Sequence, residues 1–148
     1  KIQSLTDPTS KMSKSDPNDK SRIDMLDPEN IIKKRIKSAM TDSIGTIKYD
    51  PENRPGISNL LTIYSVITNM NFNEIEKKYE GVGYKDFKED LGEVVYQELK
   101  PIQERYNELI NSKELDEILD KGRDRANQVA SKKVYKLMDR IGLGRKRR

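Results

Sequence analysis

The segment KMSKS at residues 11–15 combines two lysines with small hydroxyl side chains, and it is the part of this sequence best suited to chemistry. Asp-Pro pairs at 7–8 and 16–17 frame it, so we expect a loop between two turns. The ammonium groups of Lys11 and Lys14 could reach the phosphates of a nucleotide and leave them again. A lysine that meets a departing phosphate group only in the transition state lowers the barrier. Taken alone, the pattern also fits a solvent-exposed connecting loop.

Positive charge is concentrated near the end of the chain. The 29 basic and 25 acidic side chains give a net charge of +4, but residues 121–148 carry +9 and residues 1–120 carry −5. At about 100° per residue, a helix places four basic side chains within one narrow arc: Arg125, Lys132, Lys136 and Arg140. Such an arc fits contact with the phosphates of RNA. It equally fits a helix that these charges merely keep solvated.

Two residue types are missing, because the sequence has no Cys and no His. Disulfides, thiolate zinc sites and histidine bases are therefore excluded, which leaves Lys, Asp, Glu and Tyr as catalytic candidates. We predict no metal site on the protein itself. No apolar run approaches the roughly 20 residues of a membrane span, so we expect a cytoplasmic protein with no membrane contact. With 36% charged and 33% hydrophobic residues, the chain can bury one modest core.

Helix signals dominate after the lysine loop. Asp27 is predicted to cap a helix over 28–41, whose apolar side chains recur at helical spacing: Ile32, Ile36, Ala39 and Met40. Asp42 and Asp50 are interpreted as helix-end and turn residues. A second helix begins at Gly56 and should form the centre of the core, through Ile57, Leu60, Leu61, Tyr64 and Ile67.

The second half of the chain predicts three more helices. Asn73 and Glu76 form a candidate capping box for a short helix that Gly81 closes. The longest periodic run covers 84–110. Ser112 then caps a last helical region, with a predicted break at Gly122, a stop at Gly142 and an apolar stripe directed at the core: Leu115, Ile118, Leu119, Ala126, Val129, Val134, Leu137 and Ile141. The fold class is therefore mainly α.

Three stretches carry a family resemblance. KMSKS is similar to the second signature of class I aminoacyl-tRNA synthetases, and SLTDPTSKMSKSDPN at 4–18 resembles the tryptophanyl branch of that family. YDPENRPGISNLLTIYS at 49–65 and ANQVASKKVYKLMDRIGLGR at 126–145 resemble the same branch. The resemblance thus covers the whole chain.

The resemblance implies a domain organisation. Residues 1–27 would be the end of a Rossmann-type catalytic domain with the KMSKS loop, and residues 28–148 a helical bundle that binds tRNA and its anticodon. Residues 1–6 would then be the tail of the last strand of that domain. The family's HIGH-like motif requires a histidine, which this chain lacks, so the fragment is expected to be inactive alone.

The resemblance also implies the chemistry. The full-length protein would use ATP with substrate-bound Mg²⁺, tryptophan and the tRNA for tryptophan, and would form a homodimer, although the fragment could be a monomer. Lys14 would contact the ATP phosphates and Lys11 would play a lesser, similar part. The loop as a whole would bind ATP through Lys11, Met12, Ser13, Lys14 and Ser15. Arg125, Lys132, Lys136 and Arg140 would contact the tRNA.

Two other interpretations stay open at this stage. One is a non-catalytic helical RNA-binding module that keeps a loop similar to KMSKS, and the other is a helical DNA-binding or scaffold protein with a basic arm. The sequence identifies neither the residues that read an anticodon nor the role of the basic tail Arg145 to Arg148.

Overall fold

The computed structural model describes residues 1–143, and the tail Arg145 to Arg148 lies outside them. The chain divides into two compact units, Lys1–Glu104 and the part from Arg105 onward. The described part contains no strand, and its elements are η1 (Asp19–Ser21), α1 (Glu29–Lys37), α2 (Pro55–Thr68), α3 (Phe72–Lys78), α4 (Tyr84–Ile110) and α5 (Lys113–Arg140). The mainly α fold class is confirmed.

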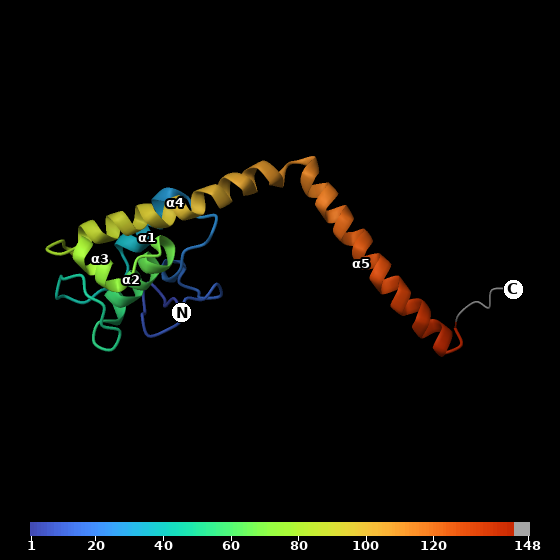
Figure 1. The fold of residues 1–148 in the computed structure, drawn as a ribbon, viewed down its shortest axis with the longest axis horizontal. Coiled ribbons are helices and arrows are strands. Elements are labelled where there is room, and N and C mark those ends of the chain that lie inside the picture. Colours follow the sequence, from blue (N-terminus) through green and yellow to red (C-terminus); the bar gives the residue numbers. More distant parts are fainter. Residues whose placement is uncertain (144–148) are drawn as a thin grey trace. The chain divides into compact units, whose positions relative to one another are not determined.

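The first unit packs its helices around α2, and Figure 1 shows α1, α2 and α3 gathered along the first part of α4. The proline at the first position of α2 suits a helix start, and the helix then buries most of its length. Each large apolar side chain that is fully buried contributes about 1.5–3 kcal/mol. The core draws on every helix of the unit and on the N-terminal segment: Leu5, Ile32, Ile36, Ile57, Leu60, Leu61, Tyr64, Ile75, Phe87 and Leu91.

The predicted start and end of the first helix are wrong by a few residues. Pro28, not Asp27, is the N-cap, because the Asp27 carboxylate accepts from the amide of Asp24 (2.7 Å) and from Arg35. The helix ends at Lys37, and Met40 lies beyond it, half exposed. Its amide donates to the carbonyl of Leu5 (2.7 Å) instead of continuing the helix.

The capping box of α3 lies two residues earlier than predicted. Asn71 accepts from the amide of Glu74 (3.0 Å), and Glu74 accepts from the amide of Asn71 (2.8 Å). Glu76, the predicted partner, accepts from the main chain of Tyr49 (2.8 Å) and so joins α3 to the preceding loop. Gly81 has a φ of 76° and closes the helical segment as predicted.

The second unit contains α5, whose termini match the prediction. Ser112 accepts from the amide of Leu115 (3.4 Å), and Gly142 ends the helix with a φ of 75°. The predicted break at Gly122 is wrong, because α5 runs without interruption from Lys113 to Arg140. The predicted burial of the apolar stripe is also wrong, since α5 has no buried residue within the described part. A unit this short has too little surface to build a core of its own.

None of the helices in residues 1–143 is both long and apolar enough to cross a membrane.

Candidate functional site

The KMSKS loop starts from a short pairing of two backbone segments. Gln3 and Lys11 form an antiparallel bridge. Two hydrogen bonds between their neighbours make it, one from the amide of Ser4 to the carbonyl of Ser10 (2.8 Å) and one from the amide of Met12 to the carbonyl of Ile2 (3.2 Å). Polar side chains support the turn between them, because Asp7 accepts from the amide and hydroxyl of Thr9 and from the hydroxyl of Ser10. The hydrogen bonds from Ser10 and Thr9 hold the pKa of the Asp7 carboxyl below its usual value.

The loop itself presents its lysines to solvent. Lys11, Ser13, Lys14 and Ser15 are exposed, whereas Met12 is half-buried and packs against the core of the first unit. The hydroxyls of Ser13 and Ser15, on either side of Lys14 in the sequence, lie 3.1 Å apart. The amide of Asp16 donates to the carbonyl of Ser13 (3.4 Å) and closes the turn. The side chain of Met12 therefore anchors a loop whose two ammonium groups point to no partner within residues 1–143.

Arginine side chains fasten the segment that leaves the loop. Arg22 donates to the carbonyl of Asp16 (2.8 Å) and pairs with the carboxylates of Asp19 (2.8 Å) and Asp24 (3.2 Å). Arg35 on α1 donates to the carbonyl of Arg22 (3.2 Å). The amide of Leu5 donates to the carbonyl of Ser21 (2.9 Å), which joins this segment to the N-terminal segment. Both ends of the loop are thus fixed by hydrogen bonds, and the lysines lie between them.

The predicted RNA-binding side chains lie on α5. Arg125, Lys132, Lys136 and Arg140 are all exposed, and none of the four makes an ion pair with another side chain of residues 1–143. Arg123, on another face of the helix, is paired with Asp120 (2.7 Å) and Asp124 (3.0 Å).

A polar cluster around the buried Arg54 joins the connection between α1 and α2 to α4. Arg54, at the N-cap of α2, donates to Asp42 (2.9 Å) and to the hydroxyl of Tyr84 (2.6 Å), and it also bonds the main chain of Thr46. Burial alone would raise the pKa of Asp42, but the hydrogen bonds from Arg54 and Tyr84 outweigh it and lower the pKa to about 2. The interpretation of Asp42 as a helix-end residue is wrong, because α1 ends at Lys37 and Asp42 pairs with Arg54 and Tyr84 instead. Asp50 bonds Asn53 within its turn, as predicted.

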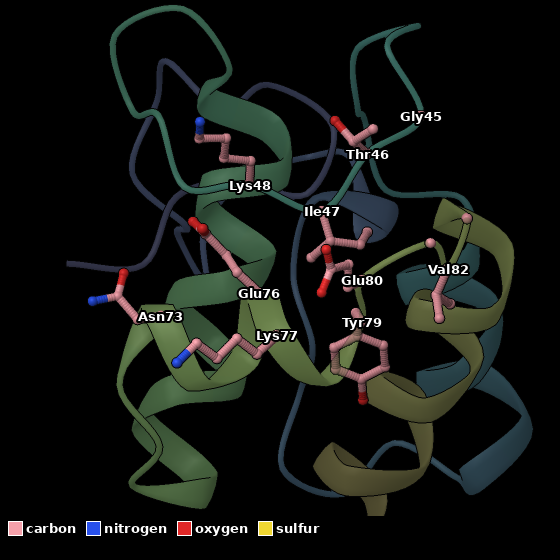
Figure 2. Close-up of a pocket in the computed structure, with 12 residues that line it drawn as sticks. Gly45, Thr46, Ile47, Lys48, Asn73, Glu76, Lys77, Tyr79, Glu80 and Val82 are labelled. Carbon is pink, nitrogen blue, oxygen red and sulfur yellow. The ribbon is translucent and has the colours of Figure 1, made fainter.

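A hollow of the first unit lies elsewhere. It measures about 730 Å³, and Figure 2 shows side chains of α3 facing the loop that precedes α2. Its lining mixes charges of both signs with glycines and includes no residue of the KMSKS loop: Gly45, Thr46, Ile47, Lys48, Asn73, Glu76, Lys77, Tyr79, Glu80, Gly81, Val82 and Gly83. One of the carboxylates, Glu76, is already used by the main chain of Tyr49.

No group of three or more Asp and Glu side chains within residues 1–143 is arranged to hold a metal ion.

Asn59 is the residue at this site that the sequence interpretation did not single out. It lies on α2 and is buried, with 5% of its surface exposed. Its side-chain amide bonds both backbone groups of Gln3, at 2.8 and 2.9 Å. An asparagine inside the most hydrophobic helix was the available signal, because a buried polar side chain requires a partner.

The comparisons with known proteins agree with this geometry. The family model described as tRNA synthetases class I (W and Y) matches residues 1–100, so the chain belongs to that family of class I aminoacyl-tRNA synthetases. Within it, the chain is similar to the tryptophan enzymes. It is 61% identical to the tryptophan–tRNA ligase of Bacillus anthracis and 59% identical to that of Bacillus subtilis, over all 148 residues.

Solved structures show the same likeness. The tryptophanyl-tRNA synthetase of Mycoplasma pneumoniae aligns over 97% of this chain with a TM-score of 0.75 and 30% identity. The Campylobacter jejuni synthetase, complexed with ADP and tryptophan, aligns over 97% with a TM-score of 0.74 and 33% identity. The chain spans 45% of the length of the two Bacillus relatives and 44% of each solved chain.

Proposed function

We propose that this chain is part of a tryptophan–tRNA ligase and supplies the cover over the phosphates of ATP. The observation that carries the proposal is the exposed pair Lys11 and Lys14 on a hydrogen-bonded base, within a chain 61% identical to such a ligase. In the reaction, the tryptophan carboxylate attacks the α-phosphate of ATP, forms tryptophanyl-adenylate and releases pyrophosphate. A terminal hydroxyl of the tRNA then attacks the carbonyl of the adenylate, which transfers the tryptophanyl group to the tRNA and releases AMP.

Lys14 is the residue proposed to act in the first step. Negative charge builds on the departing pyrophosphate as the bond to the α-phosphate breaks, and an ammonium group that meets it there stabilises the transition state. The exposure of Lys14 allows the loop to move onto the nucleotide and away again. Lys11 adds a second positive charge, and Mg²⁺ enters with the phosphates as part of the substrate.

The rest of the proposal concerns the remainder of the protein. Residues 1–27 would close the catalytic domain and residues 28–148 would form the tRNA-binding domain, with phosphate contacts from Arg125, Lys132, Lys136 and Arg140. The full-length protein would be a cytoplasmic homodimer. Residues 1–148 alone would form no adenylate, because they contain no histidine for a HIGH-like motif.

The experiment is tryptophan-dependent exchange of pyrophosphate into ATP, with the full-length protein and its Lys14→Ala variant. We expect exchange with tryptophan but not with a panel of other amino acids. The variant should lose a factor of about 10² to 10³ in kcat, the usual effect of removing one transition-state donor. A smaller loss is expected for Lys11→Ala. If no amino acid supports exchange, the chain is better explained as a non-catalytic RNA-binding module.

A further inference from the structure

The side chain of Asn59 pairs with the main chain of Gln3 as a neighbouring strand would. Asn59 Oδ1 accepts from the amide of Gln3 (2.8 Å), and Asn59 Nδ2 donates to its carbonyl (2.9 Å). The two residues are 56 positions apart in the sequence, and Asn59 is anchored in the buried α2. A residue of the core is thus bonded directly to the base of the loop.

The geometry of the bridge explains why this contact is needed. The bonds of the bridge come from Ile2, Ser4, Ser10 and Met12, so Gln3 and Lys11 form a pair whose own amides and carbonyls point outward. On the side of Gln3 these groups point toward the interior, where an unpaired amide or carbonyl costs about 1–3 kcal/mol. The carboxamide of Asn59 satisfies both because it offers one acceptor and one donor at peptide-like spacing.

We propose that Asn59 is a positioning residue. By bonding Gln3, it fixes the place and the direction in which the KMSKS loop leaves the helical core, so that Lys14 reaches the departing pyrophosphate. This inference rests on the proposed function. Asn59 fixes Gln3, the bridge fixes Lys11 against Gln3, and Lys14 follows three residues later. The segment that leaves the loop bonds back to the same N-terminal segment, through the carbonyl of Ser21 and the amide of Leu5, and the amide of Met40 bonds the carbonyl of Leu5.

The substitution Asn59→Asp tests this role with almost no change in shape. One carboxylate oxygen still accepts from the amide of Gln3, but the other faces the carbonyl of Gln3 and repels it. The base of the loop should shift or loosen while α2 keeps its apolar contacts. A displacement of about 1 Å at a reacting group can cost about 100-fold in rate.

The main experiment is a double-mutant cycle on the full-length protein, with Asn59→Asp, Lys14→Ala and their combination in pyrophosphate exchange. We expect Asn59→Asp alone to lower kcat by about 10- to 100-fold and to leave the KM for tryptophan within about twofold. In the Lys14→Ala background the same change should cost less than about threefold, because the group it positions is already gone. Should Asn59→Asp prevent folding, the uncharged Asn59→Ser replaces it, since its hydroxyl is too short to bond both groups.

Ser58→Ala is the matched control. Ser58 precedes Asn59 on α2 and is equally buried, but its hydroxyl accepts from the amide of Asp50 (2.9 Å) and forms no hydrogen bond with the loop base. Its effect on kcat should be small and should multiply with that of Lys14→Ala. If Asn59→Asp lowers kcat by the same factor in the Lys14→Ala background as in the unmutated protein, the inference is overturned.

Trypsin cleavage after Lys11 and Lys14, followed by mass spectrometry, gives a readout that does not depend on activity. We expect Asn59→Asp to speed this cleavage by about tenfold, because local opening of the loop becomes easier, and Ser58→Ala to leave it unchanged. Unchanged cleavage in Asn59→Asp would count against Asn59 as the anchor. Absence of exchange in the unmutated protein would refute the proposed function, and the cleavage rates would still decide whether Asn59 holds the loop.

Discussion

Arg54 and Asp42 form a salt bridge of 2.9 Å that is largely shielded from solvent, with 8% and 21% of their side chains exposed. The pKa of Asp42 lies at about 2, below its value of 3.8 in an unfolded chain. The ionised carboxylate therefore stabilises the folded state above about pH 4, and this contribution of about 2 kcal/mol is lost as the pH falls toward 2. We expect Asp42→Asn to make unfolding less dependent on pH between 4 and 2, as measured by urea unfolding of the full-length protein.

At pH 7 the same variant should lose about 3 kcal/mol of stability, because Arg54 stays buried without its carboxylate. Asp86→Asn is the control, since Asp86 lies exposed on the first turn of α4 and should contribute less than about 1 kcal/mol. Equal losses in the two variants would contradict the assignment of the acid response to Asp42.

Two glycines should respond to alanine in opposite directions. At Gly122 a new methyl group would meet no atom within 4 Å, so Gly122→Ala should stabilise α5 by about 0.5–1 kcal/mol. At Gly56 the methyl group would collide with the main-chain carbonyl of Met40, so Gly56→Ala should destabilise the first unit or displace the loop after α1. Thermal unfolding followed by circular dichroism compares the two, and a gain in stability for Gly56→Ala would contradict this packing.

Lys88 should react slowly with amine reagents. Its ammonium group is buried, with 8% of the residue exposed, and donates to the carbonyl of Ala39 (2.8 Å) and the hydroxyl of Thr41 (3.1 Å). Burial lowers the pKa of Lys88, which favours the reactive free amine, but the reagent cannot reach it without local opening. We expect acetylation at least about tenfold slower than at exposed Lys85 on the same helix. Mass spectrometry of the native protein measures both rates, and similar rates would mean that Lys88 is accessible.

The basic arc of α5 should dominate the salt dependence of tRNA binding. Replacing Lys132 and Lys136 together with alanine removes two candidate phosphate contacts, so the slope of log affinity against log salt should fall by about 2. Arg123→Ala should change it little, because Arg123 is already paired with Asp120 and Asp124. Filter binding of the full-length protein over a range of salt concentrations provides the measurement. An equal change in the Arg123→Ala variant would assign the effect to overall charge.

The sequence predicted those features that local spacing determines. Helical spacing identifies an apolar face without any knowledge of what covers it. The side chains found in this way are buried in the core: Ile32, Ile36, Leu60, Leu61 and Tyr64. Local spacing does not predict which residues are used when two pairs in the same segment have the spacing of a capping box. Asn71 with Glu74 and Asn73 with Glu76 have the same spacing, and the structure uses the first pair as the capping box and Glu76 as a tertiary acceptor.

Features that depend on distant pairing could not be predicted. Nothing near Arg54 indicates that its partners are Asp42 and Tyr84, and nothing near Gln3 indicates Asn59. The loop that carries the two lysines was predicted from the Asp-Pro pairs around it. Residues 1–6 were expected to be the tail of a strand, but within the described residues they form only a single bridge, from Gln3 to Lys11. The apolar stripe of α5 was assigned to a core on periodicity alone, and periodicity does not reveal whether a partner surface exists within the chain.

The single-residue bridge between Gln3 and Lys11 also bears on aggregation. Open strand edges invite pairing with other molecules, and proteins commonly protect them by covering the edge or by placing lysine on it. Here the carboxamide of Asn59 covers the edge of Gln3, and the opposite edge carries the charge of Lys11. In the folded protein both edges of this bridge are thus closed to pairing with other molecules, one by a buried carboxamide and the other by a lysine.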